Sequence, residues 1–237
     1  MAINKHFINS IYRATEGEGI FLGRPQIFVR YQGCNIGCVN CDSKETWEFE
    51  TGDSYDLNDV LAKIYSEGFS GLIKNVSITG GDPLHPKHVP RVLELVKKLK
   101  ELGFYINIEA AGTRVVPEIF DLVDYISFDI KTPSTHVKTP LELLKKMHRD
   151  YAGKFQVKAV IANLEDYQYV EKYREAVNLE FNTKDIPWVL TPCYNPEEKF
   201  PMDRFVNVMM WNEANGGHFR VIGQQHKWVY GPDKKEV

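Results

Sequence analysis

The sequence lacks the features that would place it in a membrane, in a secretory route or on nucleic acid. No apolar run approaches the roughly 20 residues that a membrane-spanning helix needs, and the N-terminal segment has no apolar core of a secretory signal. The formal net charge is only −3, which argues against nonspecific binding to nucleic acid. We therefore expect a soluble cytoplasmic protein that binds neither a membrane nor nucleic acid.

Internal repeats, low-complexity tracts and linker-like stretches are also missing. The chain has 237 residues, of which 43% are hydrophobic and 26% are charged, and this composition is ordinary for a protein with a full apolar core. We predict one domain over residues 1–237, in which residues 33–43 form a cysteine-containing loop.

Short apolar segments alternate with amphipathic helical segments from residue 26 onward. Strands are predicted at 26–31, 75–79, 104–109, 125–129, 155–161, 187–191 and 219–222. Asp56 is a predicted helix N-cap, and Thr139 is another, with Pro140 and Glu142 completing its start signal. Repeated strand–helix units indicate parallel strands with right-handed crossovers. About six core strands are too few for a closed eight-stranded barrel, so we predict an α/β fold with a partial, open β/α barrel.

Polar residues recur where these predicted strands end. In the order of the chain they are a cysteine-rich loop after Tyr31, the Gly80-Gly81-Asp82 turn after Thr79, Glu109, Asp129 with Lys131, and Thr191. Because the carboxyl ends of parallel strands meet at one edge of a sheet, these groups are expected to converge on one site.

Cysteine is scarce, and its distribution is uneven. Cys34, Cys38 and Cys41 lie in the run GCNIGCVNCDS, and Cys193 is the only other cysteine. Three thiolates on one loop neither complete a tetrahedral zinc site nor pair off as disulfides, whereas they can bind three irons of a [4Fe–4S] cubane and leave one iron open. A zinc-stabilised binding module, with Cys193 or a distant histidine as fourth ligand, stays an alternative. Cys193 is otherwise interpreted as a partly buried free thiol.

The CxxxCxxC spacing resembles the signature of the radical S-adenosylmethionine (SAM) enzymes, and SITGGDP resembles their GGE-type motif at the end of the second core strand. This resemblance implies a radical SAM type of partial barrel, in which SAM chelates the open iron. Glycine at this motif allows backbone carbonyls to approach the methionine ammonium. An activase that installs a glycyl radical on a partner protein shares these features and remains an alternative.

A narrower resemblance covers nearly the whole chain. It is carried by residues 15–19, 23–34, 41–43, 77–83, 108–113, 129–135 and 225–232. These segments are similar to the 7-carboxy-7-deazaguanine synthases, carbon–nitrogen lyases of queuosine and 7-deazapurine biosynthesis. The resemblance implies a Mg²⁺-dependent ring contraction of 6-carboxy-5,6,7,8-tetrahydropterin with release of ammonia. It also implies a homodimer and a reducing partner such as flavodoxin or ferredoxin.

Matching positions in this sequence carry the roles that the resemblance implies. The cluster ligands are Cys34, Cys38 and Cys41, and the Mg²⁺ ligand is Ser43. The substrate-binding residues are Thr15, Glu16, Gly17, Arg30, Thr79 and Pro232. The SAM-binding residues are Gly81, Asp129, Ile130, Lys131, Thr191, Pro192, Cys193 and Tyr194.

Several positions depart from the family pattern. Glu16 replaces a glutamine, Asp129-Ile130-Lys131 replaces Ser-Pro-Lys, and the residues DKKEV extend past Pro232. Ser43 replaces a threonine and keeps the hydroxyl group.

Other roles are open for the ionisable residues. Arg30 could pair with Glu18 or another nearby acid, and Glu109 and Asp129 could cap helices.

Overall fold

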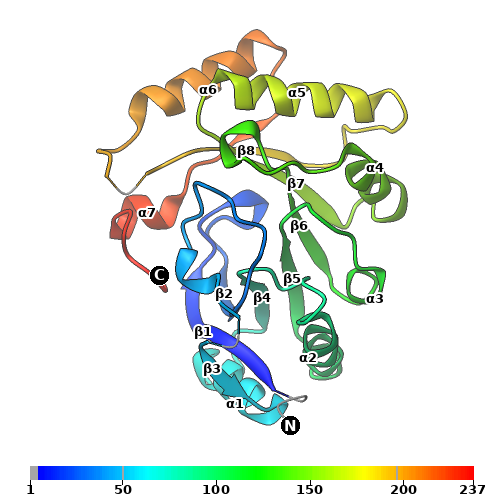
Figure 1. Cartoon of the computed structure of the whole chain (residues 1–237), viewed down its shortest axis with the longest axis vertical. Helices are drawn as coiled ribbons and strands as arrows, with labels where there is room; N and C mark the ends of the chain where they lie inside the picture. The colour runs from blue at the N-terminus through cyan, green and yellow to red at the C-terminus, as the bar shows by residue number, and fades with distance from the viewer. Residues whose placement is uncertain (1–4, 50, 196) are drawn as a thin grey trace.

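A nine-stranded sheet forms the centre of the computed structural model, which describes residues 5–49, 51–195 and 197–237 (Figure 1). The strands are β1 (His6–Thr15), β2 (Pro25–Tyr31), β3 (Asp53–Tyr55), β4 (Asn75–Gly80), β5 (Tyr105–Ala110), β6 (Tyr125–Asp129), β7 (Phe155–Ile161), β8 (Trp188–Pro192) and β9 (Arg220–Val221). Their order is β3-β1-β2-β4-β5-β6-β7-β8-β9. Neighbours from β2 to β9 are parallel, whereas β1 pairs antiparallel with β2 and β3. Since β3 and β9 end this order, the sheet does not close, and the predicted α/β fold with an open barrel is confirmed.

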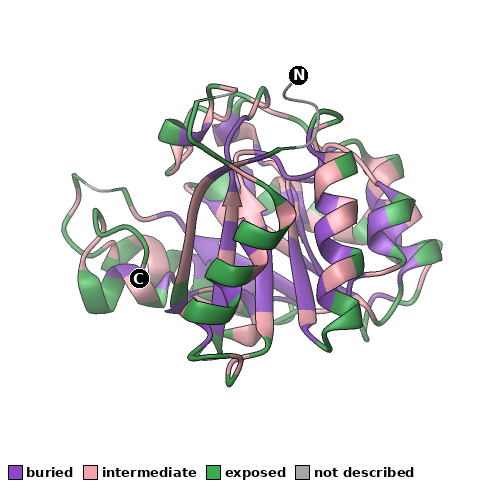
Figure 2. Cartoon of the chain, turned by 90° about the horizontal axis from the view of Figure 1, so that it is seen from below, coloured by how far each residue is buried: buried purple, intermediate pink, exposed green. Residues whose placement is uncertain are grey.

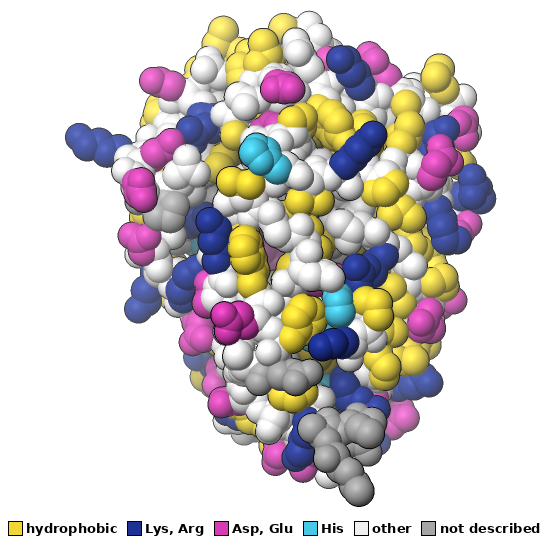
Figure 3. Space-filling model, viewed as in Figure 1, with side chains coloured by type: hydrophobic (Ala, Val, Ile, Leu, Met, Phe, Trp, Pro, Cys, Tyr) yellow, Lys and Arg dark blue, Asp and Glu magenta, His cyan; other side chains and the backbone are white. Residues whose placement is uncertain are grey.

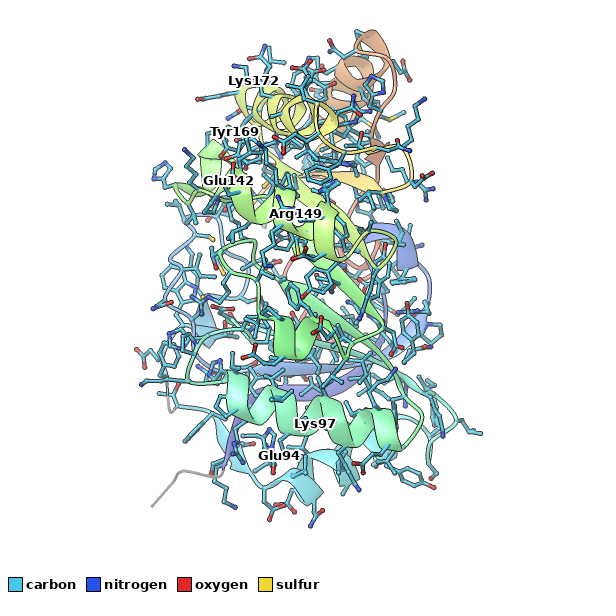
Figure 4. All side chains as sticks on the ribbon, turned by 90° about the vertical axis from the view of Figure 1, so that its right-hand side faces the viewer. Glu94, Lys97, Glu142, Arg149, Tyr169 and Lys172 are labelled. Atoms are coloured by element: carbon cyan, nitrogen blue, oxygen red, sulfur yellow. The ribbon has the colours of Figure 1, made fainter. Side chains whose placement is uncertain are left out.

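Helices cover the outside of the curved sheet. They are α1 (Leu57–Glu67), α2 (Val89–Glu101), α3 (Pro117–Phe120), α4 (Leu141–Asp150), α5 (Leu164–Asn178), α6 (Met202–Ala214) and α7 (Gln225–Tyr230). Three short 3₁₀ turns are η1 (Gly19–Phe21), η2 (Lys44–Thr46) and η3 (Pro133–Thr135). Figure 4 looks onto this outer layer, where Glu94 and Lys97 of α2 and Lys172 of α5 lie on its surface. Within the described residues, no helix is both long and apolar enough to cross a membrane.

The two faces of each parallel strand differ in chemistry. Side chains that point toward the helices are apolar, and Val29, Ile78, Ile108 and Phe128 are completely buried. Figure 2 shows the strands as mostly buried and the helices as exposed on their outer sides. Burying one such side chain stabilises the fold by roughly 1.5–3 kcal/mol. The opposite face carries most of the polar side chains of these strands, such as Arg30, Asn107 and Lys158, and lines the inside of the partial barrel.

The predicted strands correspond to β2 and to β4 through β9. The two strands that the prediction lacks, β1 and β3, form the antiparallel edge of the sheet. In β1, an irregularity between Ile8 and Ser10 interrupts the register with β2, so the strand lacks the regular alternation that predicts a strand.

One of the two predicted helix starts is correct. The Asp56 side chain accepts a hydrogen bond from the N–H of Asp59 at 3.0 Å, and caps α1 as expected. The Thr139 prediction is wrong, because Pro140 occupies the N-cap of α4 and no side chain caps it. Thr139 Oγ1 instead accepts a hydrogen bond from the N–H of Lys131 at 2.9 Å, so this hydroxyl braces the loop after β6.

Candidate active site

The cysteine loop follows β2 directly and is tied down by backbone hydrogen bonds. The N–H of Gly33 donates to the carbonyl of Thr46 at 2.7 Å, and the N–H of Cys34 donates to that of Trp47 at 3.0 Å. Further along, the N–H of Val39 donates to Thr135 of η3 at 3.1 Å. The loop is therefore held between η2 and η3, at the carboxyl ends of the strands.

The three cysteines are reduced, partly exposed and close to one another. The N–H of Ile36 donates to Cys34 Sγ at 3.4 Å, and the N–H of Ser43 donates to Cys41 Sγ at 3.4 Å. Burial raises the pKa of the Cys34 thiol, the Ile36 N–H opposes this, and the neighbouring cysteines add to the rise. Backbone donors to sulfur are one of the means by which proteins tune iron–sulfur clusters. The donor set fits such a cluster.

The described residues contain no set of three or more His, Cys, Asp or Glu side chains gathered around a single ion. In a cubane each thiolate binds a different iron, so the sulfurs stand further apart than around one zinc ion. Cys193, the proposed fourth zinc ligand, is buried and donates from Sγ to Asn195 Oδ1 at 3.3 Å. Cys193 thus has a hydrogen-bond partner of its own outside the cysteine loop.

The glycine turn after β4 packs against the start of the cysteine loop. The N–H of Asp82 donates to the carbonyl of Gly33 at 3.1 Å. A Cβ atom at Gly81 would lie 2.6 Å from the Gly33 carbonyl oxygen and 2.8 Å from Cys34 Cβ. At Gly80, φ is 141° and a Cβ would lie 2.4 Å from the backbone of Tyr31. Only glycine fits these contacts, so the motif has a packing reason beside the cluster loop.

Arg30, Thr79 and Ser43 come together inside the barrel mouth. Arg30 on β2 is the direct partner of Thr79 on β4. Arg30 Nη1 donates to Ser43 Oγ at 3.4 Å, and Nη2 donates to the Tyr12 hydroxyl at 3.2 Å. Burial works to lower the pKa of Arg30, but Tyr12 and the acids Asp42 and Glu45 outweigh it and raise that pKa. The predicted substrate arginine thus lies beside the predicted Mg²⁺ ligand.

The alternative pairing of Arg30 with Glu18 is wrong. Among the described residues no ion pair includes Arg30, and Glu18 Oε2 instead lies 3.3 Å from Lys158 Nζ. Lys158 also lies 3.1 Å from Glu109 Oε2. Asp129 pairs with Lys131 at 2.8 Å. Glu109 and Asp129 are therefore partners of lysines inside the barrel and not helix caps.

The two glutamates of the TEGEG turn ionise very differently. Burial, followed by the charge of Glu109, raises the pKa of Glu16 to about 7. Burial would also raise the pKa of Glu18, but Lys158, His226 and the Gln224 amide together lower it to about 2. At neutral pH Glu18 is a carboxylate, while Glu16 is partly protonated.

The predicted substrate contacts of this turn are mostly enclosed by protein. Glu16 Oε2 accepts from Gln26 Nε2 at 2.6 Å, and Oε1 accepts from the N–H of Glu18 at 3.2 Å. A Cβ at Gly17 would lie 2.0 Å from His226 Nδ1, so this histidine covers the glycine. Thr15 is exposed at the end of β1.

The predicted SAM residues line the ends of β4, β6 and β8. Ile130 is buried, and its N–H donates to the Lys158 carbonyl at 2.7 Å. Thr191 Oγ1 is buried and has no hydrogen-bond partner among the described residues, which leaves it available to a ligand. Burial would lower the pKa of Lys131, but Asp129 and Cys38 outweigh it and raise that pKa. Pro192 ends β8, and the Tyr194 carbonyl accepts from Lys227 Nζ at 3.4 Å.

Helix α7 closes one side of this mouth. The N–H of Gln225 donates to the Gly17 carbonyl at 2.9 Å, and Gln224 Nε2 donates to Glu18 Oε1 at 2.7 Å. Pro232 follows α7 and is partly exposed. Among the site residues, sequence reasoning missed Lys158. Its signal is a lysine at an inward position of the alternating strand FQVKAVI, next to strands that end in acids.

Comparison with known proteins places these features in a family. A family model described as a 4Fe–4S single cluster domain matches residues 15–117. The chain is 30% identical to a 7-carboxy-7-deazaguanine synthase from Pyrobaculum aerophilum, over 93% of this chain and 93% of that protein. It is also 30% identical to the synthase from Thermoplasma acidophilum, over 94% of this chain and 97% of that protein.

Solved structures show the same fold. QueE from Escherichia coli matches with a TM-score of 0.67 and 24% identity, over 94% of this chain and 95% of that chain. A structure of TYW1 with a lysine–pyruvate adduct matches with a TM-score of 0.51 and 13% identity, over 79% of this chain and 73% of that chain. With the cysteine loop, the glycine turn and near full-length similarity at 30% identity, the chain belongs to the 7-carboxy-7-deazaguanine synthase family.

Proposed function

We propose that this protein converts 6-carboxy-5,6,7,8-tetrahydropterin to 7-carboxy-7-deazaguanine with release of ammonia, as a radical SAM carbon–nitrogen lyase. The observation that carries the proposal is the meeting of the three-cysteine loop with Arg30, Ser43 and Thr79 in one barrel mouth. A glycyl-radical activase would need the cysteine loop but not Arg30, Ser43 or the TEGEG turn. Membership of the synthase family favours the pterin reaction over that alternative.

Cys34, Cys38 and Cys41 hold a [4Fe–4S] cluster, and SAM completes the site. When bound, the cluster and SAM supply the radical chemistry that removes hydrogen from the substrate. Residues at the strand ends hold SAM in this proposal, namely Gly81, Asp129, Ile130, Lys131, Thr191, Pro192, Cys193 and Tyr194. Thr191 offers an unpartnered hydroxyl, whereas Ile130, with its side chain buried and its N–H in use, offers only its backbone carbonyl.

Arg30 binds the substrate carboxylate and Ser43 binds the Mg²⁺ ion in this proposal. A guanidinium presents paired N–H donors that match a carboxylate, and the Ser43 hydroxyl is a hard oxygen ligand of the kind Mg²⁺ prefers. With the substrate carboxylate shared between them, the ion and Arg30 orient the pterin ring. Thr79 lies beside Arg30, and Thr15, Glu16, Gly17 and Pro232 complete the substrate wall.

A homodimer is the proposed assembly. Met202, Val206, Met209 and Met210 are 59%, 43%, 40% and 58% exposed and form one stripe along α6. Trp228 of α7 is also exposed and contacts Phe205 of α6 at a ring distance of 5.6 Å. Figure 3 shows hydrophobic side chains at the top of the molecule, where α6 lies. An apolar surface of this kind supports contact with a second subunit.

The compartment and the reductant follow from the chemistry of the cluster. Iron-binding thiols must stay reduced, and the cytoplasm keeps them so. Each turnover begins with an electron, so we assign a small electron carrier such as flavodoxin or ferredoxin as the partner. The whole chain acts as one domain in this proposal.

The experiment that tests this function uses protein reconstituted without oxygen. With reductant, SAM, Mg²⁺ and 6-carboxytetrahydropterin, mass spectrometry should detect 7-carboxy-7-deazaguanine and ammonia. Ser43→Ala should raise the Mg²⁺ concentration for half-maximal rate by at least roughly tenfold, while Ser54→Ala, at an exposed position of β3, should not. An intact cluster without product would refute the substrate, and an unchanged Mg²⁺ response would refute the role of Ser43.

A further inference from the structure

The residues beyond Pro232 fold back onto the cysteine loop. Lys235 Nζ donates to the backbone carbonyl of Asp42 and lies 3.6 Å from Glu45 Oε1. Asp42 stands between the cluster ligand Cys41 and Ser43 in the chain. Figure 1 shows the C-terminal end beside the short turn η2, which follows the loop. The end of the chain therefore touches the segment that carries both predicted metal sites.

A second lysine, which lies before Pro232 in α7, reaches the same aspartate. Lys227 of α7 has a side chain only 8% exposed, and its Nζ lies 3.7 Å from Asp42 Oδ2. It also donates to the Tyr194 carbonyl at 3.4 Å. A buried ammonium is costly unless it is paired, so these contacts define where α7 sits. Asp42 thus receives one lysine at its backbone and another at its carboxylate.

Asp42 in turn orients the hydroxyl group of Ser43. Ser43 Oγ donates to Asp42 Oδ1 at 3.0 Å and accepts from Arg30 Nη1 at 3.4 Å. A hydroxyl has one donor and two acceptor sites. Donation to Asp42 leaves the oxygen lone pairs of Ser43 for Arg30 and for an ion. Such outer contacts orient the groups that bind a metal.

The other end of the segment is anchored across the mouth. Gln224 and Gln225 bond the TEGEG turn through Glu18 and Gly17. Residues 224–235 therefore bridge two walls of the site. The Lys235 and Glu45 side chains are 58% and 49% exposed, and ion pairs between exposed groups are weak. The exposed Lys235 contact is therefore a weaker attachment than the buried Lys227 contact.

We propose that Lys227 and Lys235 are positioning residues, which hold Asp42 so that Ser43 presents its oxygen to the Mg²⁺–carboxylate complex, and that residues 224–235 form a strap whose free end opens at Lys235. This inference rests on the proposed role of Ser43 in Mg²⁺ binding. It gives a role to the residues beyond Pro232, for which the family resemblance implies no role.

Two measurements on the cluster-loaded protein test the strap. Lys235→Ala should increase backbone hydrogen exchange at residues 41–46 and raise the half-saturating Mg²⁺ concentration by roughly tenfold, the low end for loss of an outer contact. Its kcat at saturating Mg²⁺ should stay near that of the wild type. Lys227→Met should have a larger effect on both readouts, because its ammonium is buried. High salt should move the wild type toward Lys235→Ala, since exposed charges are screened.

Lys234→Ala is the matched control, because the described structure records no side-chain hydrogen bond or ion pair for Lys234, and it should behave as the wild type. Hydrogen exchange in Lys235→Ala equal to that of Lys234→Ala would overturn the strap. Increased exchange with an unchanged Mg²⁺ requirement would overturn the positioning role. If the wild type makes no product at all, the proposed function fails, and the exchange measurement still decides the strap.

Discussion

The helix-covered face of the sheet and the face inside the partial barrel use the same strands with opposite chemistry. On β5, Ile106 and Ile108 point outward and are completely buried, while Asn107 and Glu109 point inward. The outer face is stabilised by removal of apolar surface from water, which depends on volume and shape. The inner face is stabilised by specific partners, which depend on charge and geometry.

A ladder of side chains crosses the inner face below the site. Asn107 Nδ2 donates to Ser77 Oγ at 3.0 Å, Ser127 Oγ donates to Asn107 Oδ1 at 3.2 Å, and Gln156 Nε2 donates to Ser127 Oγ at 2.9 Å. Each buried polar group is satisfied by a neighbour on the next strand. Removing one side chain leaves its neighbour without a hydrogen-bond partner. Substitutions on the inner face should therefore lower the free energy of unfolding more than substitutions on the outer face.

The largest effect is expected at Lys158 on the inner face. Lys158→Met leaves the carboxylates of Glu18 and Glu109 without their shared cation. Breaking a buried ion pair in this way costs about 3–5 kcal/mol of the free energy of unfolding, which urea denaturation at pH 8 measures. Lys172→Met, on the outer surface of α5 (Figure 4), should change it by less than about 0.5 kcal/mol. Equal losses in the two variants would contradict the cost assigned to the ion pairs of the inner face.

An intermediate effect, dependent on pH, is expected at Glu16. Its pKa rises from 4.5 in the unfolded chain to about 7 when folded, so between these values the folded state binds more protons. The stabilising contribution of Glu16 is complete below pH 4.5 and is lost as the pH rises through 7. Glu16→Gln cannot ionise. At pH 8 it should be more stable than the wild type by on the order of 1–3 kcal/mol, and at pH 5 nearly equal.

Urea denaturation at the two pH values measures this difference. Glu18→Gln is the control, because its effect on the free energy of unfolding at pH 8 should have the opposite sign. The pKa of Glu18 is lowered to about 2, so its charge stabilises the fold above pH 4.5, and the variant should lose stability at pH 8. A Glu16→Gln variant that is no more stable than the wild type at pH 8 would show that Glu16 is ionised at little cost.

The smallest effect is expected on the outer face. Ile108→Val removes one methyl group from a completely buried position and should lower the free energy of unfolding by about 1 kcal/mol. Cluster content and the Mg²⁺ requirement should not change, because the side chain points away from the site. Iron and sulfide per chain measure the cluster content. A lower content in this variant would contradict the claim that the outer face contributes only to stability.

Local patterns were enough for the parallel strands and for the cysteine loop. Alternation over residues 125–129 and 155–161 predicts β6 and β7 with the same bounds that the structure has. The GCNIGCVNCDS run contains its own ligands within one loop. These features depend on neighbours in the chain, so sequence spacing carries them.

Other features depend on partners far along the chain. Thr139 has the pattern of a helix cap, yet its hydroxyl accepts a hydrogen bond from Lys131, because the loop after β6 offers a partly buried N–H that needs an acceptor. Glu18 meets Lys158 and Gln224 across 140 and 206 positions respectively. No pattern of neighbouring residues predicts such pairs.

The sequence by itself therefore determined the strand–helix alternation, the three-cysteine loop and the expected edge of the sheet for the site, since each follows from side-chain periodicity or from residues a few positions apart. Only the tertiary structure decided which acids meet which lysines, that Glu16 is held partly protonated beside an ionised Glu18, and that Lys227 and Lys235 contact Asp42. Those outcomes depend on burial and on distances between segments remote in sequence, and both arise only when the chain is folded.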